Sequence, residues 1–233
     1  MSAWPTPTGW AVVALSLKVS VLAGALTLPV SYALAWLLAR RRFPGRILLD
    51  AAVHLPLVLP PVVTGWVLLL LFGRTGPLGH WLEEATGLVL VFRWTGAALA
   101  AAVMALPLMV RAMRLSIEAV DRRLVGAART LGATRWRAFL TITLPLSLPG
   151  VLAGTMLGFA RSLGEFGATI TFASNIPGET RTLPLAIYTG LQVPGAEGAV
   201  TRLAIISVVL SVAALLASEL LVRRSHGRRA HVL

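Results

Sequence analysis

The chain has 233 residues, of which 57% are hydrophobic and 13% are charged. Soluble domains carry about twice that share of charged residues, so much of the apolar surface must meet lipid. The net charge of +12 would suit a nucleic-acid binder. However, the arginines cluster between apolar runs, as in the loops of a membrane protein, so we expect a lipid bilayer and no nucleic acid as partner.

Five stretches are long and apolar enough to cross a bilayer, which takes about 20 residues each. In chain order they are residues 10–39, 47–72, 95–117, 146–166 and 203–222. The first stretch lacks the basic start of a signal peptide and continues well past Lys18, so we expect it to remain in the membrane. The sequence therefore predicts an all-α polytopic helix bundle, with residues 1–233 forming a single transmembrane domain.

The second stretch contains Pro56, Pro60 and Pro61. Proline inside a spanning helix breaks backbone hydrogen bonds, which neighbouring helices or water must then satisfy. We expect a kinked helix that faces the bundle. The alternative is a helix that bends during gating.

Arginine counts in the connecting segments predict the orientation, since cytoplasmic loops carry an excess of Lys and Arg. If Arg40 to Arg46 lie inside, fifteen arginines fall on the cytoplasmic side and only four outside. The N-terminus is then outside and the C-terminus inside. Two outer segments, residues 73–94 and 167–201, are too interrupted to be simple spans. We expect the second either to dip back between helices or to cap the bundle.

The inner segment, residues 117–145, is far longer than a minimal turn, and we expect short helices in it. Small residues would let another surface approach its backbone, arginines would add polar contacts, and Trp136, Phe139 and Leu140 would return to the bundle. Such a helix suits a groove on a partner protein. The alternative is an ordinary connector. The predicted docking residues are Gly126, Ala127, Ala128, Arg129, Gly132 and Ala133.

The spacing of this segment resembles the cytoplasmic signature of ABC importer permeases. The matching positions are Ala127, Ala128, Gly132, Ile142, Leu144 and Pro145, and the one departure is Gly126, where the family has a glutamate. The resemblance implies the type I importer permease fold. It also implies that residues 127–133 form a coupling helix, which docks on a nucleotide-binding subunit.

No ATPase is expected on this chain. A phosphate-binding Walker loop needs a lysine after a glycine-rich turn, and the only lysine is Lys18, within the first apolar stretch. We therefore expect a non-catalytic translocation subunit with no catalytic residue, no cofactor and no metal. ATP hydrolysis would come from a partner chain.

The fourth stretch carries Gly150, Gly154 and Gly158, a stripe that favours close helix packing. Arg161 and Glu165 follow four residues apart. Ionised residues at membrane depth are costly and face a cavity or a partner, so they form either a structural ion pair or part of a gate. Asp50 and His54 have the same spacing, and we expect a structural role for them.

The substrate prediction rests on residues 161–184. Leu163-Gly164-Glu165-Phe166-Gly167 resembles molybdate and sulfate permeases alike. The stretches 168–172 and 175–182 resemble the molybdate branch of the family. Hydroxyls and backbone amides are weak anion ligands that permit release. The predicted path or gate residues are Arg161, Ser162, Glu165, Thr169 and Thr171.

The resemblance implies a homodimer of permeases, two ATP-binding cassette subunits and a periplasmic molybdate-binding protein, in a bacterial inner membrane. The expected function is ATP-driven import of molybdate into the cytoplasm. Sulfate or tungstate import is the alternative. A membrane-embedded enzyme would need a cluster of catalytic groups at one depth in the helices, which Arg161 and Glu165 alone do not supply. A gated channel would not need the docking segment.

Overall fold

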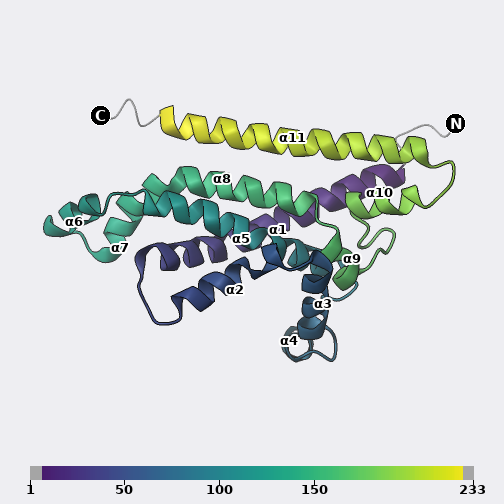
Figure 1. Cartoon of the computed structure of the whole chain (residues 1–233), viewed down its shortest axis with the longest axis horizontal. Coiled ribbons are helices and arrows are strands. Elements are labelled where there is room, and N and C mark those ends of the chain that lie inside the picture. The colour runs from purple at the N-terminus through teal and green to yellow at the C-terminus, as the bar shows by residue number, and fades with distance from the viewer. Residues whose placement is uncertain (1–6, 228–233) are drawn as a thin grey trace.

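The computed structural model describes residues 7–227, and every regular element among them is helical (Figure 1). Arg228 and Arg229, two of the arginines used to predict the orientation, lie outside the described residues. The elements are α1 (Pro7–Arg40), α2 (Arg46–Val58), α3 (Pro61–Phe72), α4 (Pro77–Thr86), α5 (Trp94–Glu118), α6 (Arg122–Thr130), α7 (Arg135–Ala138), the π-helix η1 (Phe139–Thr143), α8 (Leu144–Leu163), α9 (Gly167–Ala173), α10 (Leu183–Leu191) and α11 (Glu197–Gly227).

Within the described residues, four helical runs are long and apolar enough to cross a membrane: Gly9–Arg40, Trp94–Glu118, Arg135–Leu163 and Glu197–Ala217. The pair α2 and α3 adds a fifth if it is counted as one broken segment. The all-helical class and the number of about five spanning segments are therefore confirmed. The third run joins α7, η1 and α8 into one continuous helix.

The helix α5 lies at the centre of the bundle and packs against α1, α2, α8 and α9. Its first half is rich in alanine, and Ala97, Ala100, Ala101 and Ala105 are fully buried. Small side chains let neighbouring backbones approach closely, which is how helices associate in lipid, where apolar burial alone gives no driving force. Larger buried side chains such as Met109 fill the second half.

The glycine stripe of α8 faces α5, which confirms its expected role in packing. A Cβ at Gly150 would collide with the side chain of Ser116, and a Cβ at Gly154 would lie 3.2 Å from the Met109 carbonyl oxygen. The Ser116 hydroxyl donates to the Ser147 carbonyl at 3.2 Å across the same contact. The two helices can be this close only because these positions lack side chains.

The stretch that contains Pro56, Pro60 and Pro61 forms two separate helices, α2 and α3, and not one kinked helix. The chain bends by 118° from the axis of α2 to that of α3, with the break at Leu59 and Pro60. Both residues precede a proline, which disfavours helical backbone, and both are extended with ψ of 144° and 135°. Pro61 then starts α3 at its first turn, where its missing N–H costs nothing. In Figure 1, α3 consequently runs across the direction of α5 and α8 and carries α4 away from them.

Apart from α3 and α4, the short helices lie toward the two ends of the bundle (Figure 1). The helices α6 and α7 lie at one end, together with the C-terminal end of α11, whereas α9 and α10 lie at the other. Residues 117–145 contain short helices, and residues 167–201 fold back as α9 and α10. The helix α9 packs against α3 and α5, and α10 packs against α11 and α1.

The packing of α8 on α5 predicts unequal effects of two alanine substitutions. Gly150→Ala forces two backbones apart, because its Cβ meets Ser116 Cβ and, at 3.0 Å, the Ala112 carbonyl oxygen. Gly158→Ala meets only the flexible Met109 side chain. We expect Gly150→Ala to cost about 1–3 kcal/mol, lowering the Tm of the detergent-solubilised protein, and Gly158→Ala to change it by less. An equal or larger drop for Gly158→Ala would contradict this account.

Candidate functional site

The helix α6 is the core of the predicted docking segment, and its sequence explains both of its ends. Asp121 caps the N-terminus, its side chain accepting the Arg123 N–H at 2.8 Å. At the C-terminus, Gly132 N–H donates to Arg129 O at 3.1 Å and Ala133 N–H donates to Ala128 O at 3.0 Å. This is the Schellman arrangement, which needs positive φ at the glycine, and Gly132 has φ of 90°.

None of the α6 residues is buried within the chain. Gly126, Ala127, Arg129 and Gly132 are exposed, while Ala128 and Ala133 are half-buried. A Cβ built on Gly126 or Gly132 meets nothing within 4 Å. The segment therefore offers its backbone to any surface that approaches, and Leu131, 89% exposed, stands at its end.

An aromatic cluster fixes the docking segment to the bundle. The Phe139 ring lies 6.0 Å from the Tyr32 ring and 6.2 Å from the Trp36 ring, both on α1, and it stacks on Trp136 at 5.3 Å. Arg40, at the end of α1, donates to the carbonyl oxygens of Ile117 and Val120 at 2.9 and 3.0 Å. Of the three residues expected to return to the bundle, Phe139 does so, whereas Trp136 and Leu140 remain 68% and 43% exposed.

The segment enters α8 through the π-helix η1, where the Leu144 N–H bonds back to Phe139 O. Pro145 follows at the start of α8 and has no N–H to donate. The π-helical turn thus coincides with the Ile142–Pro145 part of the signature. Single π-turns inside α-helices are frequent at functional sites.

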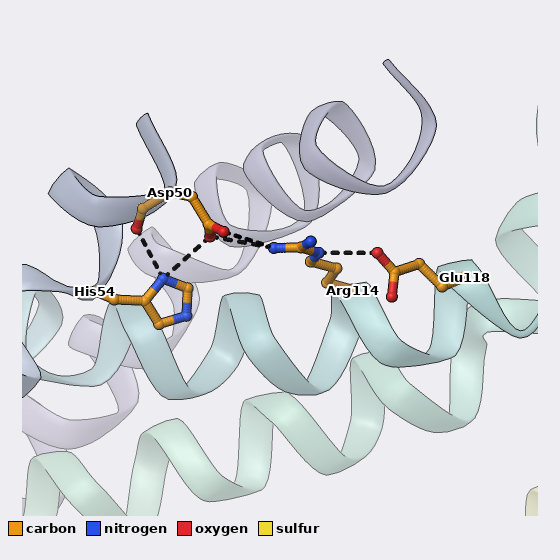
Figure 2. Close-up of polar contacts among 4 residues, drawn as sticks. All are labelled: Asp50, His54, Arg114 and Glu118. Atoms are coloured by element: carbon orange, nitrogen blue, oxygen red, sulfur yellow. Dashed lines mark hydrogen bonds and ion pairs between the residues drawn. The ribbon is translucent and has the colours of Figure 1, made fainter. Parts of the chain in front are cut away.

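A polar network joins α2 to α5 near the same end of the bundle (Figure 2). Arg114 on α5 donates to both carboxylate oxygens of Asp50 at 3.1 Å and to Glu118 at 2.9 Å. His54 reaches the Asp50 carboxylate at 3.3 Å and the Asp50 carbonyl oxygen at 2.9 Å. The Asp50–His54 pair expected from spacing is therefore one part of a larger network. Sequence reasoning missed Arg114, which is 64 residues away from Asp50.

The predicted path or gate residues gather where α8 turns into α9. The Arg161 Nη1 atom lies 2.6 Å from Glu165 Oε2, and Glu165 is only 2% exposed. The other carboxylate oxygen of Glu165 accepts the Ala168 N–H at 2.8 Å, at the start of α9. One carboxylate thus neutralises Arg161 and also satisfies a backbone donor of the next helix. This geometry provides a structural role for the pair.

The three hydroxyl residues of the predicted path differ in exposure. Ser162 and Thr169 are buried within the subunit, and the Ser162 hydroxyl donates to Ala101 O at 3.4 Å. Thr171 is half-buried. Its hydroxyl donates to Gly167 O at 3.0 Å, and its Cβ packs beside Gly65 of α3. Contact of these residues with an anion stays a prediction.

Within residues 7–227, no group of three or more His, Asp or Glu side chains is placed to hold a metal ion. The Asp50 network instead joins α2 to α5, and the Arg161–Glu165 pair lies where α8 turns into α9. The chemistry available at these two places is charge neutralisation and hydrogen bonding. Neither place offers a nucleophile with a general base beside it.

The chain is similar to known proteins in both sequence and fold. Residues 31–227 match the family described as binding-protein-dependent transport system inner membrane component. The chain is 60% identical over 223 residues to the molybdenum transport system permease protein ModB of Escherichia coli (strain K12), covering 96% of this chain and 97% of the relative. It is 41% identical over 200 residues to the sulfate transport system permease protein CysT of the same strain, covering 84% and 70%.

Among solved structures, a bacterial ABC transporter involved in the import of the acidic polysaccharide alginate superimposes with a TM-score of 0.75. The match covers 95% of this chain and 81% of that chain, at 18% sequence identity. At so low an identity the similarity shows a shared fold.

The α8–α9 corner predicts a stability effect for Glu165. Glu165→Ala removes both the ion pair and the cap, leaving Arg161 without its partner at partial burial, and we expect a loss of about 3 kcal/mol. Glu165→Gln keeps an acceptor for the Ala168 N–H and should lose less. Thermal unfolding of the purified protein in detergent measures both. If the two variants unfold at the wild-type temperature, the carboxylate does not hold this corner.

Proposed function

The chain belongs to the family of inner-membrane components of binding-protein-dependent transport systems, and from this premise we propose that it is the translocation subunit of a molybdate importer. Multi-pass insertion in the inner membrane follows from the family and from the apolar helices. The substrate follows from the relatives: identity is 60% to the molybdenum permease and 41% to the sulfate permease.

The observation that carries the proposal is the exposed docking segment. The helix α6 is capped at both ends, yet it buries no residue within the chain. Exposed small residues and Leu131 are suited to a groove on another protein. We infer that this partner is an ATPase, because the chain has a single lysine, Lys18, and no phosphate-binding loop.

The proposed assembly has two copies of this chain, two ATPase subunits under the docking segments and a substrate-binding protein on the opposite side. The arginine-rich end, with α6 and α7, faces the cytoplasm. ATP binding would draw the two ATPases together and turn the path outward, where the loaded binding protein delivers its anion. Hydrolysis would return the path to the inward state.

Rigid mechanical connections support this cycle. The aromatic cluster around Phe139 holds the docking segment on α1, and η1 continues without a break into α8. We therefore expect a displacement of the docking segment to reach both helices. At the other end of α8, where the chain turns into α9, Glu165 neutralises the charge of Arg161. A path of hydroxyls and amides then lets an anion leave again, where an unneutralised arginine would retain it.

Sulfate import is the second candidate, because the sulfate permease CysT is 41% identical over most of this chain. Both substrates are tetrahedral oxyanions, and the hydroxyl residues of the α8–α9 corner do not distinguish them. Selection between the two would fall largely to the binding protein.

Transport in liposomes tests the proposed function. The permease, its ATPase and its binding protein are reconstituted, and ATP turnover and uptake are measured with molybdate, tungstate and sulfate. We expect the molybdate-loaded binding protein to stimulate turnover and uptake. Equal stimulation by sulfate would favour the second candidate. Turnover that ignores the loaded binding protein would rule out an importer.

The docking assignment predicts a loss of ATPase association in Gly132→Arg. The side chain would project into open space from a backbone that has φ of 90°, and its bulk would block the partner. We expect ATPase co-purification to fall about tenfold or more, with membrane insertion unchanged. Gly132→Ala imposes the left-handed strain, about 1 kcal/mol, without the bulk, and should retain the ATPase.

Gly178→Arg is the matched control for charge, strain and bulk. Gly178 has φ of 78° and open space around its Cα, but it lies between α9 and α10 at the opposite end of the bundle. Co-purification of Gly178→Arg should equal that of the wild type. If Gly132→Arg also retains the ATPase, the partner does not dock on this segment.

A further inference from the structure

A cavity of about 380 Å³ lies between the end of α1 and the docking segment. Its walls come from α1, α6, α7, η1 and the residue that follows α1, so both membrane-spanning and docking elements contribute. Five arginines line it, together with the aromatic rings of Trp36 and Phe139. The arginines are Arg40, Arg41, Arg122, Arg129 and Arg135.

The charge of this arginine cavity is not compensated by its own walls. No carboxylate is among the described residues that line it. The two acids nearby in sequence are already engaged: Glu118 pairs with Arg114, and Asp121 caps α6. Within residues 7–227, the side chains of Arg122, Arg129 and Arg135 form no hydrogen bond or ion pair.

The other two arginines have uncharged partners, which do not neutralise the guanidinium groups. Arg40 donates to the backbone carbonyl oxygens of Ile117 and Val120, and Arg41 lies over the Trp36 ring at 5.6 Å. Neither contact supplies a negative charge. Like charges gathered at one cavity repel one another, so an anion that binds between them removes an unfavourable interaction. Guanidinium groups also match phosphate oxygens in geometry.

We propose that this arginine cavity binds the headgroup of an anionic phospholipid from the cytoplasmic leaflet. The proposal rests on the orientation proposed above, and it goes beyond the transport function. Basic pockets between membrane-spanning helices on the cytoplasmic side are suited to anionic headgroups. The aromatic wall of Trp36 and Phe139, with the exposed Trp136 stacked behind it, belongs at the level of the headgroups.

The position of the cavity favours lipid over the ATPase as its occupant. More than half of its lining residues belong to α1, to η1 or to the residue that follows α1, and both α1 and η1 are parts of membrane-spanning runs: they are Trp36, Arg40, Arg41, Phe139 and Thr143. The predicted docking residues, apart from Arg129, do not line it. A headgroup held here would bridge the end of α1 to α6 and α7. It would thereby fix the docking segment relative to the bundle.

Native mass spectrometry of the detergent-purified permease–ATPase complex tests the proposal, with phosphatidylglycerol titrated as the probe. The test variant is Arg122→Gln/Arg135→Gln. Each arginine near an anionic headgroup contributes a factor of about five in affinity, so we expect phosphatidylglycerol to bind roughly thirtyfold more weakly. The variant Arg122→Lys/Arg135→Lys keeps the charges and should recover most of the binding, which separates charge from a folding defect.

The matched control is Arg123→Gln/Arg137→Gln. It removes the same charge from the same two helices at positions that do not line the cavity, and it should bind phosphatidylglycerol as the wild type does. Two further arms identify the ligand: phosphatidylcholine, which carries no net charge, should bind weakly, and millimolar inorganic phosphate should not displace phosphatidylglycerol.

Three results would overturn the proposal. Equal losses of phosphatidylglycerol binding in the test and control variants would mean that the lipid is attracted to basic loops in general and not to this cavity. Displacement by inorganic phosphate would make a free oxyanion the ligand. Loss of the ATPase with unchanged phosphatidylglycerol binding would make the ATPase the occupant. Lipid binding is measured without ATP or molybdate, so a failure of molybdate import would leave this test intact.

Discussion

The close contact between α8 and α5 is the interaction on which the other features of this subunit depend. Lipid tails are as apolar as the side chains themselves, so burying apolar side chains between helices gains little free energy. Helices in lipid therefore associate through tight packing and hydrogen bonds. Gly150 and Gly154 let α8 lie directly on α5, and the Ser116–Ser147 hydrogen bond crosses the contact. The alanine-rich half of α5 then accepts α1 and α9 on its remaining faces.

The contact matters for function because α8 connects both ends of the molecule. At one end it continues through η1 into the docking segment, and at the other it turns at Glu165 into α9. The aromatic cluster around Phe139 holds the first end to α1, and Arg40 of α1 in turn donates hydrogen bonds to Ile117 and Val120 at the end of α5. A force applied to α6 therefore acts on a connected set of helices.

Charged side chains within the helices also hold the bundle together. A charge at membrane depth is costly unless it is paired, and both charged clusters within the helices are paired. Arg114 joins Asp50 of α2 to Glu118 of α5, while Glu165 neutralises Arg161 and caps α9. The arginine cavity is the exception. It lies at the surface end of the bundle, where water and anionic headgroups can stabilise the charges, and this difference of location is why its arginines can remain without acidic partners.

The sequence by itself determined the helical class, the number of spanning segments, the presence of short helices in residues 117–145 and the family, because hydropathy and motif spacing are local properties. It also indicated that Gly150, Gly154 and Gly158 pack against a neighbouring helix. Only the tertiary structure decided that Pro60 and Pro61 turn the chain by 118°, since a proline kink can range from slight to complete. It alone brought Arg114 to Asp50 and five arginines around one cavity, because such contacts join residues that are distant in the chain and depend on how the helices pack.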